Sequence, residues 1–279
     1  MCANVVLQIT KKLAGESAGT ALWCSSVGNE SGQVLITVMT ASEGIGLEQM
    51  ADGLMNRYNA AGVEPPVLLY VDRDCCALGG GVSSTKKMFA GWRDLVIRLD
   101  VWHFMRRIAI GATTEAHPLY GLFMSRLADC IFEWDKNDVD RLVAAKKSEL
   151  EMQGFPQATD EDARERISSR ELRLHCRRST RGPNETIKLI SHLVTELSGP
   201  NGQDTLGVPV LDPSRIFKVW DTQQRHVKCL QDPPAIQLYT TTGHLTKGSV
   251  QLPTLRCARG STSLESFHLH VARFVPGRL

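Results

Sequence analysis

The sequence predicts an α/β protein in which a three-stranded meander is continued by α/β crossovers. Three runs rich in Val, Ile, Leu and Thr, separated by Gly and Asn/Ser turns, come first along the chain. Helical patterns then alternate with two further apolar runs. With 279 residues and 42% hydrophobic content, the chain can also bury a sizeable core, as one large domain or two small ones.

The meander strands are expected at "NVVLQITKKL", "GTALWCSSVGN" and "GQVLITVMTAS". Sequential strands joined by short turns favour antiparallel pairing. A helix is predicted next at "GLEQMADGLMNRYNAAG", with an apolar face made of Leu47, Met50, Leu54 and Met55. Gly62 is its expected end, since glycine commonly terminates helices.

Two further strands complete the predicted sheet. "PPVLLYVD" is apolar throughout, which is typical of a strand buried on both faces. A Gly-rich connection and a short helix at "STKKMFAGW" lead to the fifth strand, "DLVIRLD". The predicted order is therefore β-β-β-α-β-α-β.

The rest of the chain is predicted to be mostly helical. Helical patterns run from Val101 to about Ser198, and the Pro- and Gly-rich segment up to Arg256 is expected to be irregular beyond a helix at "SRIFKVWDTQQRHVKCL". A last helix is predicted at "GSTSLESFHLHVARF", with Ser261 or Ser263 as N-cap and Pro276 as its stop. We thus divide the chain into a first core part (1–103), a mostly helical insertion with an irregular end (104–256) and a final helix (257–279).

Composition narrows the classes of protein. The net charge of +2 is too mild to indicate a nucleic-acid partner without local clustering. No run approaches the roughly 20 apolar residues of a membrane helix, and the N-terminus lacks the basic start of a signal peptide. Eight cysteines without paired spacing favour reduced thiols in the cytosol or nucleus over a disulfide framework. No membrane partner is expected.

Acidic residues stand where the predicted strands end. Asp72 follows the fourth strand, Asp100 follows the fifth, and His103 comes three positions later. Ligands of open α/β sheets bind outside such strand ends. Glu265 lies near the start of the final helix, where a carboxylate suits the helix dipole or points into a site. Converging carboxylates are what Mg²⁺ needs, which indicates a metal-dependent phosphodiester site.

These residues and the strand order resemble a known family. The chain is similar to the RNase H-like transposases of the DDE type, closest to the Mutator, hAT and Kolobok groups. The resemblance rests on Asp72 in "LLYVDRDCC", on the Asp-x-x-His motif of Asp100 and His103 in "LDVWH", and on Glu265 in "RGSTSLESFH". Segments such as "VGNESGQVL" and "RCARGSTSLESFHLH" also resemble transposon-derived proteins of fish genomes.

The resemblance implies a fold and an activity. The fold would be an RNase H-like mixed sheet with a helical insertion before the last catalytic helix. The reaction would be DNA strand cleavage and transfer at a two-metal Mg²⁺ or Mn²⁺ site, with Asp72 and Glu265 as metal ligands. Asp100 and His103 would be accessory members of the site. DNA would be the partner and the nucleus the compartment, while the oligomeric state stays open.

One expected acid is missing. The family carries its first catalytic aspartate in the first strand, and no acid precedes Glu16 here. The polar residues available are Asn4, Gln8 and Thr10. An amide oxygen can ligate a metal but lacks the charge that holds Mg²⁺ tightly. We therefore expect impaired or absent catalysis, in a fragment or a domesticated relic of a transposase. The alternatives are a non-enzymatic DNA- or protein-binding module and a different RNase H-like nuclease.

The sharpest charge feature is "RERISSRELRLHCRRSTRG". If this segment is helical, spacings of four, three, four and four place its arginines on one stripe, made of Arg166, Arg170, Arg173, Arg177 and Arg181. With the adjacent Arg178, these are the predicted DNA contacts, because arginine binds phosphate in a bidentate way. The alternative is a solvated helix face.

Three weaker signals have structural alternatives. "HVKC", from His226 to Cys229, has the spacing of half a zinc site but no matching second pair. His268 lies one turn after Glu265 and either supports the site or packs the helix. The tryptophans expected in the core are Trp92, Trp102, Trp134 and Trp220.

Overall fold

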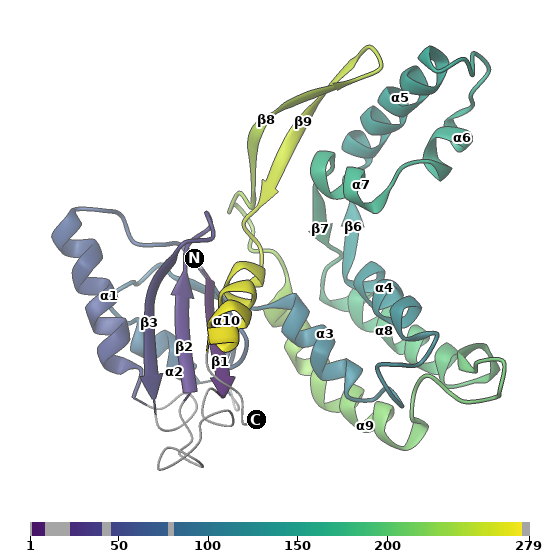
Figure 1. Ribbon diagram of the computed structural model, residues 1–279. Coiled ribbons are helices and arrows are strands. Elements are labelled where there is room, and N and C mark those ends of the chain that lie inside the picture. Colours follow the sequence, from purple (N-terminus) through teal and green to yellow (C-terminus); the bar gives the residue numbers. More distant parts are fainter. Residues whose placement is uncertain (1, 9–22, 41–45, 78–80, 275–279) are drawn as a thin grey trace.

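The computed structural model describes residues 2–8, 23–40, 46–77 and 81–274, and these form a mixed α/β protein (Figure 1). Its main sheet consists of β1 (Cys2–Gln8), β2 (Trp23–Gly28), β3 (Val34–Thr40), β4 (Leu68–Val71) and β5 (Val96–Leu99). The strand order is β3-β2-β1-β4-β5. β2 pairs antiparallel with β1 and β3, whereas β4 pairs parallel with β1 and β5. The predicted meander with parallel crossovers is confirmed.

Helices pack beside the sheet and form much of the rest of the described chain, which also contains the short paired strands β6 (Phe132–Trp134) and β7 (Arg178–Thr180). The helices are α1 (Glu48–Ala61), α2 (Ser84–Met88), α3 (Val101–Ala109), α4 (Tyr120–Ile131), α5 (Lys136–Met152), α6 (Asp160–Glu165), α7 (Ser169–His175), α8 (Pro183–Leu197), α9 (Pro213–Gln223) and α10 (Thr262–Phe274), with the 3₁₀ segments η3 (Pro200–Gly202) and η4 (Gln224–Leu230). The predicted first helix is confirmed and ends at Gly62, whose left-handed backbone (φ 61°) suits glycine. Among the described residues, no helix is long and apolar enough to span a membrane.

The two faces of the sheet bury different partners. Along β4, Leu68 and Tyr70 pack with Leu264 of α10. Leu69 and Val71 instead join the large cluster that contains the buried face of α1. Successive side chains of a strand point to opposite faces, so β4 is buried on both sides as its sequence predicted. Helix α10 lies along β1 (Figure 1). The last described helix therefore packs against the first strand of the chain.

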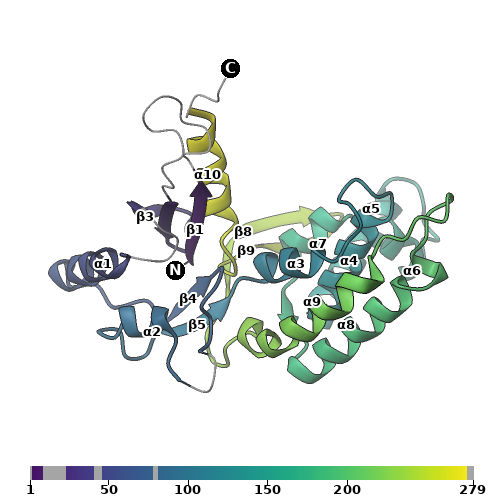
Figure 2. The ribbon, with the colours of Figure 1, turned by 90° about the horizontal axis from the view of Figure 1, so that it is seen from below.

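The large hydrophobic cluster continues from the sheet into the helical region. It joins Leu99 of β5 and Phe104 of α3 to Phe123 of α4, Ile190 of α8 and Trp220 of α9. Figure 2 shows α3, α4, α8 and α9 gathered beyond the β5 edge of the sheet. The predicted insertion therefore shares a core with the sheet.

The segment predicted to be irregular contains a long hairpin, so that prediction was wrong. β8 (Tyr239–Lys247) and β9 (Val250–Cys257) pair antiparallel and extend away from the sheet (Figure 1). Most of their side chains are not buried, and Leu252 anchors the hairpin against α5 and α7. The apolar alternation that identifies a half-buried strand is therefore weak. Pro253 is tolerated because a two-stranded ribbon has open edges.

Two other expectations need correction. The single helix predicted at "SRIFKVWDTQQRHVKCL" is α9 followed by the 3₁₀ segment η4. Trp92 and Trp220 are core residues as predicted, and Trp134 is partly buried, but Trp102 is 48% exposed. Trp102 is the second residue of α3, where the helix leaves the sheet and one side of its first turn meets solvent. Thr10, Glu16 and Pro276 lie outside the described residues.

Candidate functional site

The candidate site lies where β4 and β5 end. Asp72 directly follows β4 and is two residues beyond Tyr70, which faces α10. Strand alternation therefore directs Asp72 toward the α10 side of the sheet. Glu265 lies in the first turn of α10. Asp72 and Glu265, which are far apart in the sequence, are therefore on the same side of the sheet.

Asp100 accepts hydrogen bonds from residues at the starts of two helices. It is the N-cap of α3, where its Oδ1 accepts a hydrogen bond from the backbone N–H of Trp102 at 2.7 Å. Its Oδ2 accepts from the backbone N–H of Ser261 at 2.7 Å and from the Ser261 hydroxyl. Asp100 is only 2% exposed. One buried carboxylate therefore joins the starts of α3 and α10.

Gly260 makes this junction possible. Its φ of +89° lies in the left-handed region that side-chain-bearing residues rarely adopt. A Cβ built at position 260 would be 3.5 Å from Asp100 Oδ2, an ordinary contact, so the backbone conformation is what requires glycine. The turn it forms presents the Ser261 N–H to Asp100.

His103 connects the acids. Its Nε2 lies 3.2 Å from Glu265 Oε1, and its Nδ1 lies 3.9 Å from Asp100 Oδ1, which is ion-pair distance but longer than a hydrogen bond. Arg107, one turn further along α3, donates to the backbone carbonyl of Asp72. Asp100 and Glu265 therefore lie against the imidazole of His103, and the charge of Asp72 also acts on it.

Burial and charge set the protonation of the cluster. Burial raises the pKa of Asp72 to about 6, against the opposing effect of the nearby His103 and Arg107 charges. Burial disfavours a charged His103, but the carboxylates of Asp100, Glu265 and Asp72 outweigh it and raise the His103 pKa to about 9. At neutral pH an imidazolium therefore supplies positive charge among the acids.

We expect this charge to make stability depend on pH. The folded pKa of His103 is raised from 6.5 to about 9, so its contribution to stability is complete below about 6.5 and is lost as pH rises through about 9. An NMR titration of the His103 ring should show a midpoint near 9. Glu265→Gln should lower that midpoint, whereas Glu115→Gln, which removes an exposed partner of Arg106, should not. A wild-type midpoint near 6.5 would contradict the ion-pair assignment.

The strand register shows which polar residue of β1 lies at the level of Asp72. Cys2 of β1 pairs in parallel with Tyr70 of β4, so continuing this register places the backbone of Asn4 at the level of Asp72, the residue after β4. Gln8 pairs instead with Trp23, towards the other end of β1. Of the polar residues that the sequence offered in the described part of this strand, Asn4 is therefore the one at the level of the site.

His268 packs the helix onto the sheet. It is 2% exposed, and its Nε2 lies 2.9 Å from the Ser26 hydroxyl of β2. Burial lowers its pKa, so it is neutral at physiological pH. Of the two predicted roles, the contacts favour helix packing.

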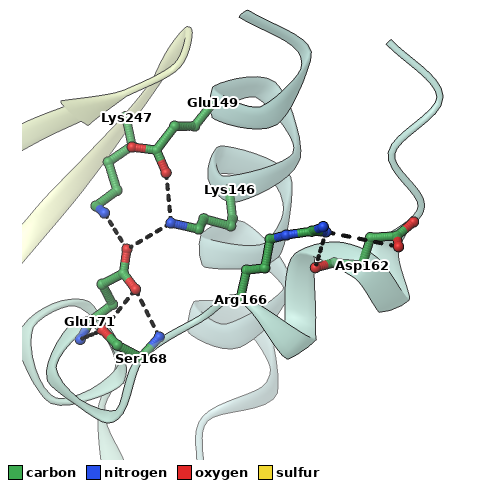
Figure 3. Close-up of polar contacts among 7 residues, drawn as sticks. All are labelled: Lys146, Glu149, Asp162, Arg166, Ser168, Glu171 and Lys247. Atoms are coloured by element: carbon green, nitrogen blue, oxygen red, sulfur yellow. Dashed lines mark hydrogen bonds and ion pairs between the residues drawn. The ribbon is translucent and has the colours of Figure 1, made fainter. Parts of the chain in front are cut away.

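The arginines do not form one helical stripe, so that geometric premise was wrong. Arg166 caps the end of α6, where it bonds the Asp162 carbonyl at 3.3 Å. A new helix, α7, then begins after its N-cap Ser168, which forms a capping box with Glu171 (Figure 3). Glu171 is further held by Lys146 and Lys247 (Figure 3). The signal for this break was the Ser-x-x-Glu pattern in "SSRE".

Several of these arginines have structural partners. Arg177 holds the buried Asp138 through two hydrogen bonds of 2.7 and 2.9 Å. Arg178 lies over the Phe132 ring, with 4.1 Å from its guanidinium carbon to the ring centroid. Arg181 bonds the Asp129 carbonyl and Glu133. Arg170 and Arg173 are also exposed, one turn apart on α7, and they take part in none of these pairs.

A second cluster, unforeseen as a whole, can hold a metal ion. The ligand atoms of Cys75, Cys76, His226 and Cys229 all lie within 4.8 Å of one another. The "HVKC" half of this cluster was visible in the sequence, but its other half is the adjacent pair in "DRDCC" rather than a second spaced motif. It is the one such group of His, Cys, Asp and Glu within the residues that the structure describes.

Comparison of the chain with protein-family models, curated proteins and solved structures finds no match. The functional argument therefore rests on the residues, the strand order and the geometry of these two clusters.

Proposed function

We propose that the chain is a DNA-binding protein derived from an RNase H-like DDE transposase, with impaired strand cleavage. The observation that carries the proposal is the meeting of Asp72, His103 and Glu265 at one end of a sheet of order β3-β2-β1-β4-β5. Acids that follow separate elements of an α/β sheet converge in this way where a ligand binds.

The residues fit a divalent cation in part. Mg²⁺ takes one or two carboxylates and completes its shell with waters and substrate phosphates, which Asp72 and Glu265 can satisfy. Burial raises the pKa of Asp72 to about 6, and a bound cation would favour the ionised carboxylate. When bound, the cation would activate the attacking oxygen and stabilise the leaving oxygen of a phosphodiester. Asn4 adds no charge at the first-strand position, so binding would be weak.

A competing function is non-enzymatic DNA or protein binding, and the His103–Glu265 pair favours it. The 3.2 Å contact places a protonated imidazole against one of the two proposed metal ligands. A cation has to displace that pairing, because like charges close together destabilise each other. We therefore expect binding to outlast cleavage.

Arg170 and Arg173 are the best-placed phosphate contacts among the predicted arginines. Both are exposed on α7, and neither takes part in the structural pairs that hold Arg166, Arg177 and Arg181. Neutralising a phosphate releases counterions, which makes binding depend on salt. The proposed DNA surface is therefore smaller than the predicted stripe.

One experiment tests both halves of the proposal. Wild-type protein should bind duplex DNA with a steep salt dependence and show weak or absent nicking of duplex and hairpin DNA in Mg²⁺ or Mn²⁺. The double variant Arg170→Ala/Arg173→Ala should flatten the plot of log affinity against log salt by roughly two units. Arg93→Ala, an exposed arginine before β5, is the control and should leave the slope unchanged.

The contrary outcomes are distinct. Robust nicking that disappears in Asp72→Ala would show an intact catalytic site and overturn the impairment. Cleavage confined to RNA–DNA hybrids would indicate a different RNase H-like nuclease. An absence of DNA binding would remove the proposal.

A further inference from the structure

The cluster of Cys75, Cys76, His226 and Cys229 has the dimensions of a metal tetrahedron. Cys75 Sγ and Cys76 Sγ are 3.8 Å apart, and His226 Nδ1 lies 3.5 Å from each. A tetrahedral zinc with Zn–S of about 2.3 Å and Zn–N of about 2.0–2.1 Å gives S···S and S···N separations of about 3.8 and 3.6 Å. Three edges of the tetrahedron therefore match, and Cys229 supplies the fourth corner within 4.8 Å.

We propose that these four residues form a structural zinc site. The bound zinc would hold the loop that follows β4, which contains Asp72, against the 3₁₀ segment η4. Three thiolates and one imidazole are soft and borderline ligands, which select zinc over Mg²⁺ or Ca²⁺. Four protein ligands close the coordination shell and leave no position for a substrate, as in structural rather than catalytic zinc sites. The three cysteines are free thiols, so no disulfide competes for them.

The site joins two distant segments. Cys75 and Cys76 lie shortly after Asp72 in the loop that follows β4, whereas His226 and Cys229 lie on η4, about 150 residues later. The loop is already constrained by Asp74, which has a positive φ of 55° and accepts a 2.6 Å hydrogen bond from the Thr85 N–H.

Next to η4, a second link reaches the sheet. Arg98 of β5 donates from Nε to the Gln231 carbonyl at 2.8 Å. Zinc at the cluster would therefore add a second connection between the main sheet and η4, the 3₁₀ segment that follows α9. This inference is independent of the proposed DNA chemistry, because it needs only the four ligands.

Metal analysis of the full untagged chain tests the site directly. Protein purified with a phosphine reductant and without chelators should contain about one zinc per chain. Cys229→Ser and Cys76→Ser should lose nearly all of it, and Cys257→Ser, at an exposed thiol outside the cluster, should retain it. Replacing zinc with Co²⁺ should give the intense visible absorption of tetrahedral cobalt and a thiolate charge-transfer band.

The proposed role of zinc in joining the two segments is tested by thermal stability and hydrogen exchange. Stripping the metal should lower the Tm by at least about 5 °C and speed hydrogen exchange in segments 72–76 and 224–230 together. His226→Cys keeps four ligands and should retain the metal, which separates ligand loss from misfolding. Wild-type protein without bound metal, whose Cys75, Cys76 and Cys229 are alkylated as readily before as after chelation, would overturn the inference. So would a disulfide within the cluster in freshly isolated protein.

Discussion

Asp100→Ala should lower the free energy of unfolding by about 3–5 kcal/mol, the size expected when a buried charge with several partners is removed. The substitution leaves the N–H groups of Trp102 and Ser261 without their acceptor in a region that is almost inaccessible to water. Two helices lose their fixed starts at once. Urea unfolding followed by circular dichroism measures the loss.

A matched aspartate gives the comparison. Asp212 is the N-cap of α9 and accepts a 3.0 Å hydrogen bond from the Ser214 N–H, but its partners are local and it is less buried than Asp100. Asp212→Ala should cost about 1 kcal/mol, the ordinary price of losing a cap. If Asp100→Ala cost no more than Asp212→Ala, the junction between α3 and α10 would not be the support we infer.

Asn4→Asp should raise cation-dependent nicking by roughly 10²-fold or more, since restoring one member of a group that acts as a unit restores most of its rate. The register of β1 and β4 puts position 4 at the level of Asp72, so the new carboxylate adds charge where the proposed cation binds. Supercoiled-plasmid nicking in Mn²⁺, at matched protein and salt concentrations, measures the gain.

The control variants define what the gain means. Gln8→Asp adds the same charge to the same strand, but at the end that pairs with Trp23, and should have no effect. Combining Asn4→Asp with Asp72→Ala should abolish the gain. Equal activity of Asn4→Asp and wild type would mean that the missing acid is not what limits cleavage, and would favour the non-enzymatic function.

The sequence alone determined the local elements. Alternation and apolar runs marked the strands of the sheet, the spacing of Met50 and Leu54 marked α1, and Asp72 and Asp100 marked the ends of β4 and β5. These signals were reliable because each depends on neighbours within one element, such as the period of a strand or the cap of a helix. The order of these elements along the chain followed from the same signals, whereas the structure showed the strand order within the sheet, β3-β2-β1-β4-β5.

Only the tertiary structure decided which distant residues meet. The partner of "HVKC" was an adjacent cysteine pair about 150 positions away, which no spacing rule links to it. The arginine stripe failed because the Ser168 capping box starts a new helix, a local competition that periodicity ignores. The hairpin β8–β9 was not predicted because most of its side chains are not buried, so its strands lack a strong apolar alternation. Long-range packing, which gives no local pattern, therefore brought together the four residues of the proposed metal site and set the register that places Asn4 at the level of Asp72.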